Sequence, residues 1–320
     1  MVKGKSMETS DSTGKRLVSF LKELFKNFSR DQCPRLAAAI AYFTIFALPP
    51  FVAFLVVLMG QFVDPEQIQE IVLGLVESII GSDGAAQLQE IIGENDAIEG
   101  GSPIAVIVGI AALIFSASGA FLSLQWALNT AWQVQPDPEQ GGARKFLFKR
   151  LSSLLMVVVF AVLLMVPLLI SGVIGVLGDI GDAALPGEVS AVLVQLITWA
   201  VAFALFTTLF AAVFRILPDA VVAWSDVWVG ALFTAFLFIA GMAGMSLYLT
   251  HADPADGFGA AGSLVLILLW IYVSALIVLI GAEFTQVWVG RKGKGVQPQD
   301  GAVRYRIELI RGARISSVVR

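Results

Sequence analysis

Six long, uninterrupted apolar runs constrain the fold of this chain more than any other feature of its sequence. Each is longer than the roughly 18 residues at which a spanning helix is predicted, and none alternates between polar and apolar residues as a transmembrane β-strand does. Hydrophobic residues make up 57% of the chain and charged residues 14%, whereas soluble domains have about 45–50% and about 25%. The sequence therefore predicts an all-α, polytopic membrane helix bundle with six transmembrane spans. The six runs are residues 36–62, 103–128, 151–177, 189–214, 227–249 and 263–289.

The lysines and arginines are sorted by position and indicate how the spans are oriented. Eight lie in residues 1–35, four in 143–150, one is Arg215 and eight lie in 290–320, which accounts for all 21. None lies in the three intervening loops, residues 64–102, 178–188 and 251–262. Basic loops stay on the cytoplasmic side of a membrane. We therefore expect a multi-pass protein of the inner cell membrane with both termini in the cytoplasm.

Three segments follow from this topology: residues 1–35 on the cytoplasmic side, a six-span domain over 36–289, and a basic cytoplasmic tail over 290–320. The outer loop 64–102 is predicted to be amphipathic. Residues 15–30 are predicted to form an amphipathic helix, which would lie along the anionic inner leaflet or pack on the cytoplasmic ends of its own bundle. Its apolar face comprises Leu17, Val18, Leu21, Leu24, Phe25 and Phe28.

The residue inventory excludes several kinds of site. Cys33 is the only cysteine and His251 the only histidine, so neither an internal disulfide nor a Cys- or His-based metal site can form. The sequence contains no P-loop, no G-x-S-x-G motif and no zincin motif. We therefore expect no cofactor, no metal, no enzymatic activity and no nucleic-acid partner.

Glu283 is the only acidic or basic residue inside an apolar run. A carboxylate in hydrocarbon costs several kcal/mol unless it is neutralised or paired, so such residues commonly mark functional sites. Neighbouring helices could equally satisfy it in a purely structural role, or it could reach the interface. The helical period places it on one face of its span with other polar residues, and polar residues on the first and second spans lie at a similar depth. These predict a polar pocket open to the cytoplasm, formed by Glu283, Tyr272, Gln286, Gln125, Asn129 and Tyr42.

Two consecutive prolines, Pro49 and Pro50, lie at the middle of the first run. They remove two backbone donors and clash with the preceding turn, which predicts a kink or a break in that helix. Broken helices at this depth are typical of transporters, although they also occur in proteins that transport nothing.

Four motifs carry a resemblance to a known family: LAAAIAYFTIFALPPF (36–51), WALNTAW (126–132), ILPDAVVAWSDVWVGAL (216–232) and GAAGSLVLILLWIYVSALIVLIGAEF (259–284). Over about residues 15–290 the chain resembles the YihY/virulence factor BrkB family of bacterial envelope proteins. The resemblance implies an inner-membrane protein linked to serum resistance and envelope lipid traffic. An old ribonuclease label in the family conflicts with the lack of a His and carboxylate cluster. Positions that match recurrent family residues are Tyr42, Pro49, Asn129, Trp132, Pro218, Asp226, Gly230, Tyr272 and Glu283.

Two functions are consistent with these observations. The first is an exporter or flippase-like transporter of an envelope lipid or another amphiphile, favoured by the proline pair and the inward polar faces. The second is a non-transporting envelope assembly or scaffold protein, favoured by the absence of a recognisable three-plus-three repeat. Membrane lipids are the expected partners, an amphiphile is the expected substrate, and a homo-oligomer is compatible with either function.

Overall fold

The computed structural model describes residues 5–59, 103–137, 187–252, 262–293 and 295–305. The predicted third span (151–177) and the amphipathic outer loop (64–102) lie outside these residues. Within them, long helices occupy the other five apolar runs: α2 (Cys33–Met59), α4 (Pro103–Trp132), α6 (Gly187–Ile216), α7 (Trp224–Ala252) and α8 (Gly262–Arg291).

Three segments of the described helices are long and apolar enough to cross a membrane: Val192–Ile216, Trp224–Tyr248 and Leu264–Arg291. Large apolar side chains on them point outward, among them Leu196 (60% exposed) and Phe236 (64% exposed). Water would not tolerate so much exposed apolar surface over three helices, whereas lipid chains cover it without cost. The chain is therefore a multi-pass membrane protein.

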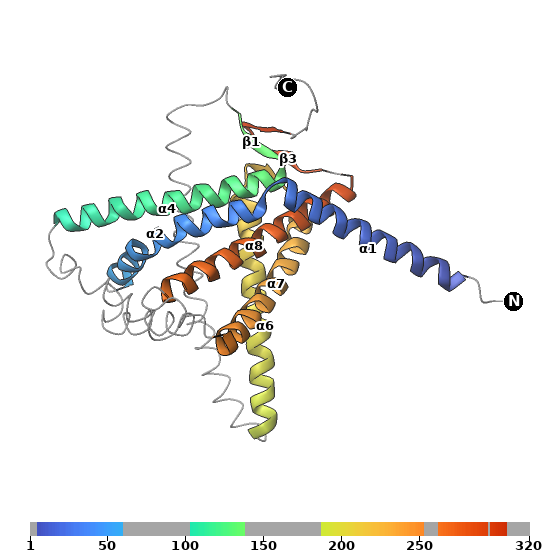
Figure 1. Ribbon diagram of the computed structural model, residues 1–320, viewed down its shortest axis with the longest axis horizontal. Helices are drawn as coiled ribbons and strands as arrows, with labels where there is room; N and C mark the ends of the chain where they lie inside the picture. Colours follow the sequence, from blue (N-terminus) through green and yellow to red (C-terminus); the bar gives the residue numbers. More distant parts are fainter. Residues whose placement is uncertain (1–4, 60–102, 138–186, 253–261, 294, 306–320) are drawn as a thin grey trace.

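The helices pack side by side in the order α6, α7, α8, α2, α4, and α4 also contacts α8 (Figure 1). Two apolar cores result. One lies between α4, α6 and α7, where Trp132 meets the ring of Phe214 edge-on at 6.2 Å. The other lies between α2, α4 and α8 and includes Cys33, Ala127 and Leu279, which are fully buried.

Helices α7 and α8 approach each other closely through two glycine–threonine pairs. A Cβ on Gly230 would lie 1.7 Å from the hydroxyl of Thr285, and one on Gly281 would lie 1.8 Å from the hydroxyl of Thr234. Each threonine donates a 2.7 Å hydrogen bond to the carbonyl oxygen four residues earlier in its own helix. Small residues let membrane helices approach closely, and here each glycine accommodates the threonine of the other helix.

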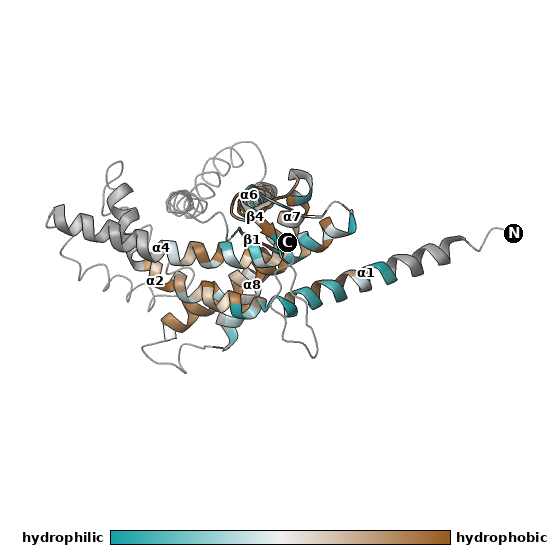
Figure 2. Cartoon of the chain, turned by 90° about the horizontal axis from the view of Figure 1, so that it is seen from above, coloured by the Kyte–Doolittle hydropathy of each residue, from teal (hydrophilic) through white to brown (hydrophobic). Residues whose placement is uncertain are grey.

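Helix α1 (Lys5–Arg30) extends the predicted amphipathic helix by ten residues at its N-terminal end and projects from the bundle in both overall views (Figures 1 and 2). Two residues, Asp31 and Gln32, connect it to α2. Gln32 has a φ of 52°, the left-handed conformation that ends helices. This elbow places the last turn of α1 directly against the bundle.

Helix α2 continues through Pro49 and Pro50 to Met59. The predicted break is therefore not observed: the backbone stays helical across the pair, because hydrogen bonds on either side of it can hold the chain in register although two donors are missing. The alternative, a kink, stays a prediction.

Part of the basic tail folds back onto the bundle, although its sequence predicted neither helix nor strand. Strand β4 (Ala302–Arg304) pairs antiparallel with β1 (Val134–Pro136), and β3 (Gln297–Pro298) pairs antiparallel with β2 (Ala220–Val221). The pairs lie at the end of the bundle where α4 and α6 finish (Figure 1). The tail thus joins the end of α4 to the loop between α6 and α7.

Candidate functional site

Glu283 is fully buried where α8 meets the start of α2. Its Oε1 accepts a 3.6 Å hydrogen bond from Sγ of Cys33. Its Oε2 is buried and receives no hydrogen bond from the residues that the structure describes. A buried carboxylate oxygen without a donor is energetically costly, so this position requires an explanation beyond packing.

The elbow between α1 and α2 brings a second acid to the same place. Asp31 is buried and lies within electrostatic reach of Glu283. Arg30 donates two hydrogen bonds to Asp31, from Nε to Oδ1 and from Nη2 to Oδ2, and both are 2.8 Å long. This bidentate bond raises the pKa of Arg30 above its ordinary value, although partial burial opposes the rise. With its oxygen assigned toward the guanidinium, the Gln133 amide also accepts from Arg30 at 2.6 Å.

The C-terminal tail contributes a tyrosine to this region. Tyr305 donates its backbone N–H to the carbonyl oxygen of Gln133 at 3.1 Å. Burial raises the pKa of the Tyr305 phenol, and the charges of Asp31, Arg30 and Glu283 all act on it. We call Arg30, Asp31, Cys33, Glu283 and Tyr305 the carboxylate site. It joins α1, α2, α8 and the tail, so a change of charge at Glu283 would act on four segments of the chain.

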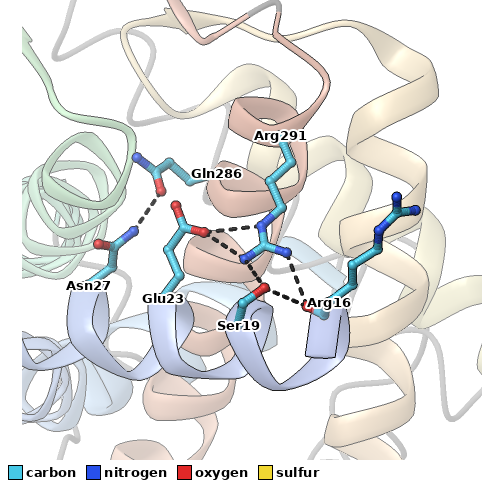
Figure 3. Close-up of polar contacts among 6 residues, drawn as sticks. All are labelled: Arg16, Ser19, Glu23, Asn27, Gln286 and Arg291. Atoms are coloured by element: carbon cyan, nitrogen blue, oxygen red, sulfur yellow. Dashed lines mark hydrogen bonds and ion pairs between the residues drawn. The ribbon is translucent and has the colours of Figure 1, made fainter. Parts of the chain in front are cut away.

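One turn beyond Glu283, α8 is bound to α1 by polar contacts (Figure 3). Asn27 donates to Oε1 of Gln286 at 3.0 Å. Arg291 forms an ion pair with Glu23 at 2.9 Å and also donates to Ser19 Oγ at 3.1 Å. We call these contacts the α1–α8 clasp. The next residue, Lys292, binds the first turn of α7 through a 2.6 Å ion pair with the buried carboxylate of Asp226.

Gln125 and Asn129 do not face Glu283. Gln125 donates to the carbonyl oxygen of Leu217 at 2.9 Å. Asn129 donates to Oδ2 of Asp219 and accepts from its backbone N–H, both at 2.8 Å. These two amides thus hold the loop between α6 and α7 against α4.

The two predicted tyrosines also lie apart from Glu283's polar contacts. Tyr42 is 57% exposed and meets the ring of Phe43 edge-on and that of Phe46 at a tilt, so it lies on the outer surface of the described helices. Tyr272 is half-buried against the apolar core between α2, α4 and α8. The prediction that Gln125, Asn129 and Tyr42 lie beside Glu283 was wrong, because depth along a span does not fix the direction in which a side chain points.

The sequence reading missed Asn27, Asp31 and Cys33. One signal was available: Asp31 is an acid directly beside a predicted first span, in a segment that is otherwise rich in bases. The tight connection between the amphipathic helix and that span would then place it near the membrane surface.

The sequence profile of the family described as Virulence factor BrkB matches residues 24–304, which is most of the chain and includes every member of the carboxylate site except Tyr305. This chain belongs to the virulence factor BrkB family. The family assignment agrees with the four motifs and with the multi-pass architecture.

Relatives of this BrkB-family chain are found across bacteria. It is 30% identical over 275 residues to a UPF0761 membrane protein of Azotobacter vinelandii, with 83% of this chain and 62% of the relative aligned. It is 26% identical over 278 residues to a UPF0761 membrane protein of Alkalilimnicola ehrlichii, covering 84% of this chain and 58% of that protein. The Bacillus subtilis protein YfkH, whose name calls it ribonuclease-like, is 24% identical over 86% of this chain and 97% of its own length. No solved structure matches the chain.

Proposed function

We propose that this protein is an exporter or flippase-like transporter of an envelope lipid or another amphiphile, driven by protons through Glu283. It resides in the inner membrane with six spans and both termini in the cytoplasm. The observation that carries the proposal is the fully buried Glu283, which lies beside Asp31 and whose Oε2 has no donor among the described residues. Ionisable groups inside membrane spans commonly belong to substrate or proton pathways.

A proton would resolve the electrostatic problem at this site. Two adjacent carboxylates repel each other when both are charged, and burial makes the repulsion stronger. Arg30 is already bound to both oxygens of Asp31. A proton between the acids would supply the donor that Glu283 Oε2 lacks. Release of that proton would leave two buried negative charges and favour a rearrangement that separates them.

The driving force, the partners and the absence of catalysis are proposed from the motifs and residue types of the sequence. Because the sequence has no ATP-binding motif, we propose that an ion gradient, here of protons, drives transport. The proposed partners are membrane lipids and an amphiphilic substrate, and not nucleic acid. We also propose that the chain is not an enzyme, because a nuclease metal centre needs a cluster of ligands and the described residues contain no group of three or more His, Cys, Asp or Glu that could hold a metal ion.

Transport in proteoliposomes tests the proposal directly. Full-length protein would be reconstituted with fluorescent phosphatidylglycerol or phosphatidylethanolamine and a pH-sensitive dye in the lumen. We expect an imposed pH gradient to accelerate probe movement between leaflets and to change the lumen pH. Glu283→Gln should abolish both effects. The matched control is Asp300→Asn, which makes the same change of acid to amide at an exposed position, and it should behave like the wild type. A wild-type protein that moves neither lipid nor protons would contradict the proposal.

A second function, a non-transporting assembly or scaffold protein, is favoured by Gln125 and Asn129. Both bind backbone or side-chain groups of the loop between α6 and α7, which stabilises one fixed arrangement of helices. In this case Glu283→Gln would leave all flux at the level of empty liposomes, as would the wild type. Envelope defects caused by deletion of the gene would then be rescued by the Gln variant.

A further inference from the structure

Helix α1 has two different long faces over residues 14–30. One face packs against α8, whereas the other is exposed among the residues that the structure describes. The packed face contains Phe20, whose ring meets that of Phe284 edge-on at 5.1 Å, and the buried Leu24 and Asn27. The α1–α8 clasp lies on the same face (Figure 3). Packing and clasp together fix the rotation of α1 about its own axis.

The fixed rotation leaves an apolar strip pointing away from α8. The strip consists of Leu17, Val18, Leu21 and Phe25, which are 60%, 51%, 45% and 70% exposed. At 3.6 residues per turn they occupy an arc of about 100°. The predicted apolar face therefore divides in two: Leu24 and Phe28 contact the bundle, and these four residues do not.

A row of lysines follows the edge of the apolar strip. Lys22 and Lys26 are exposed and fall within the next arc of about 40° around the helix. Glu23, an acid of the same segment, is bound to Arg291 on the other side. The outward surface of α1 is thus apolar along one edge and positive along the other.

We infer that α1 lies in the surface of the cytoplasmic leaflet, with the strip among acyl chains and the lysines on anionic phospholipid headgroups. Long basic side chains at a membrane interface extend their charged ends to headgroups while the apolar side chains enter the hydrocarbon. The elbow is only two residues long, so the C-terminal end of α1 lies at the level where α2 begins. This inference concerns attachment to lipid and does not depend on whether the protein transports anything.

Spin labels on the full-length protein in liposomes test this placement. Leu21→Cys and Phe25→Cys put a label on the strip, and Lys26→Cys puts one on the basic edge. The wild type is the background control, because its single cysteine, Cys33, is fully buried. In bilayers containing phosphatidylglycerol, labels at 21 and 25 should collide more with oxygen, which concentrates in lipid, than with a water-soluble nickel chelate. The label at 26 should show the reverse order.

The anionic requirement is tested by composition and by charge. Replacing Lys22 and Lys26 with Gln should reduce the ratio of lipid-inserted to water-exposed labels at position 25 by about fivefold per lysine. In pure phosphatidylcholine the same substitutions should have no effect. Nickel access at 21 and 25 equal to that at 26 would overturn the inference, because the strip would then face water. Shielding of 21 and 25 from both reagents would also overturn it, because protein, and not lipid, would cover the strip.

Discussion

Asn129 and Asp219 hold each other with two hydrogen bonds of 2.8 Å, one from the Asn129 amide to the Asp219 carboxylate and one from the Asp219 backbone N–H to the Asn129 oxygen. The two residues are 90 positions apart in the sequence. Their contact joins the last turn of α4 to the loop between α6 and α7. The same loop carries β2, which pairs with the C-terminal tail. This single amide therefore organises one end of the bundle.

Replacing Asn129 with Ala should destabilise the protein more than its loss of volume would suggest. The change removes the hydrogen bond to Oδ2 of Asp219 and leaves the Asp219 backbone N–H without its acceptor, and a hydrogen-bonding group left unsatisfied costs about 1–3 kcal/mol. Thermal unfolding in detergent would measure the loss. Thr208→Ala removes an exposed hydroxyl that bonds only to its own helix, so it should leave the unfolding temperature nearly unchanged. Equal stability of the two variants would show that the amide contributes nothing.

Replacing Gly230 with Ala should separate α7 from α8. The new Cβ would lie 1.7 Å from Thr285 Oγ1, and forcing extra atoms into a packed core typically costs about 1–3 kcal/mol. Gly244→Ala is the matched control on the same helix, because a Cβ there meets nothing within 4 Å. Thermal unfolding should show a loss for the first variant only. Adding Thr285→Ala to Gly230→Ala should recover part of it, since the overlapping hydroxyl is removed.

Two substitutions of Glu283, by Gln and by Leu, both remove its charge but should differ in their effect on stability. Gln has nearly the shape of Glu and brings N–H donors to a place beside Asp31, so Glu283→Gln should unfold at the wild-type temperature or above it. Glu283→Leu deprives the Cys33 thiol of its acceptor and should lower stability by about 1–3 kcal/mol. Thermal unfolding of both variants in one detergent decides the matter. If Leu is as stable as Gln, polar contacts do not hold this carboxyl group in place.

The sequence predicted the helices well because a membrane span is a local property. Five of the predicted apolar runs correspond to helices α2, α4, α6, α7 and α8. The first and last residues of each run lie within a few residues of the ends of its helix. The strands of the tail escaped prediction because two or three residues are too few to show a period.

The candidate site was predicted only in part, because its contacts are distant in sequence. Glu283 could be singled out by its charge alone, but Cys33 bonds to it across 250 positions. Helical period indicated that Gln286 shares its face, yet the partner of Gln286 proved to be Asn27 on a helix outside the spans. Tyr42 matched in depth and points outward. Neither depth nor period reveals which helices are neighbours.

The six-span topology makes a prediction that reporter fusions can check. Fusions after Gly100 and Asp256 should report the external side, and fusions after Gln140 and at the C-terminus should report the cytoplasm. The reason is that every Lys and Arg lies in segments assigned to the cytoplasm, and basic segments resist translocation. One fusion with the opposite result would require a different number of spans.

Reversal of the clasp charges should reposition α1 while changing global stability little. The Glu23–Arg291 pair is exposed on both sides (48% and 35%), and exposed pairs contribute about 0.2–1 kcal/mol. Arg291→Glu would place two acids together and remove the hydrogen bond to Ser19, so this end of α1 should move away from α8. The Glu23→Arg, Arg291→Glu double variant restores opposite charges and should bring it back. Distances between spin labels at Leu17 and Trp288 measure the movement.

If both single charge reversals keep the wild-type distance, the ion pair is not needed to hold α1. The ring contact of Phe20 with Phe284 and the hydrogen bond from Asn27 to Gln286 would then be sufficient.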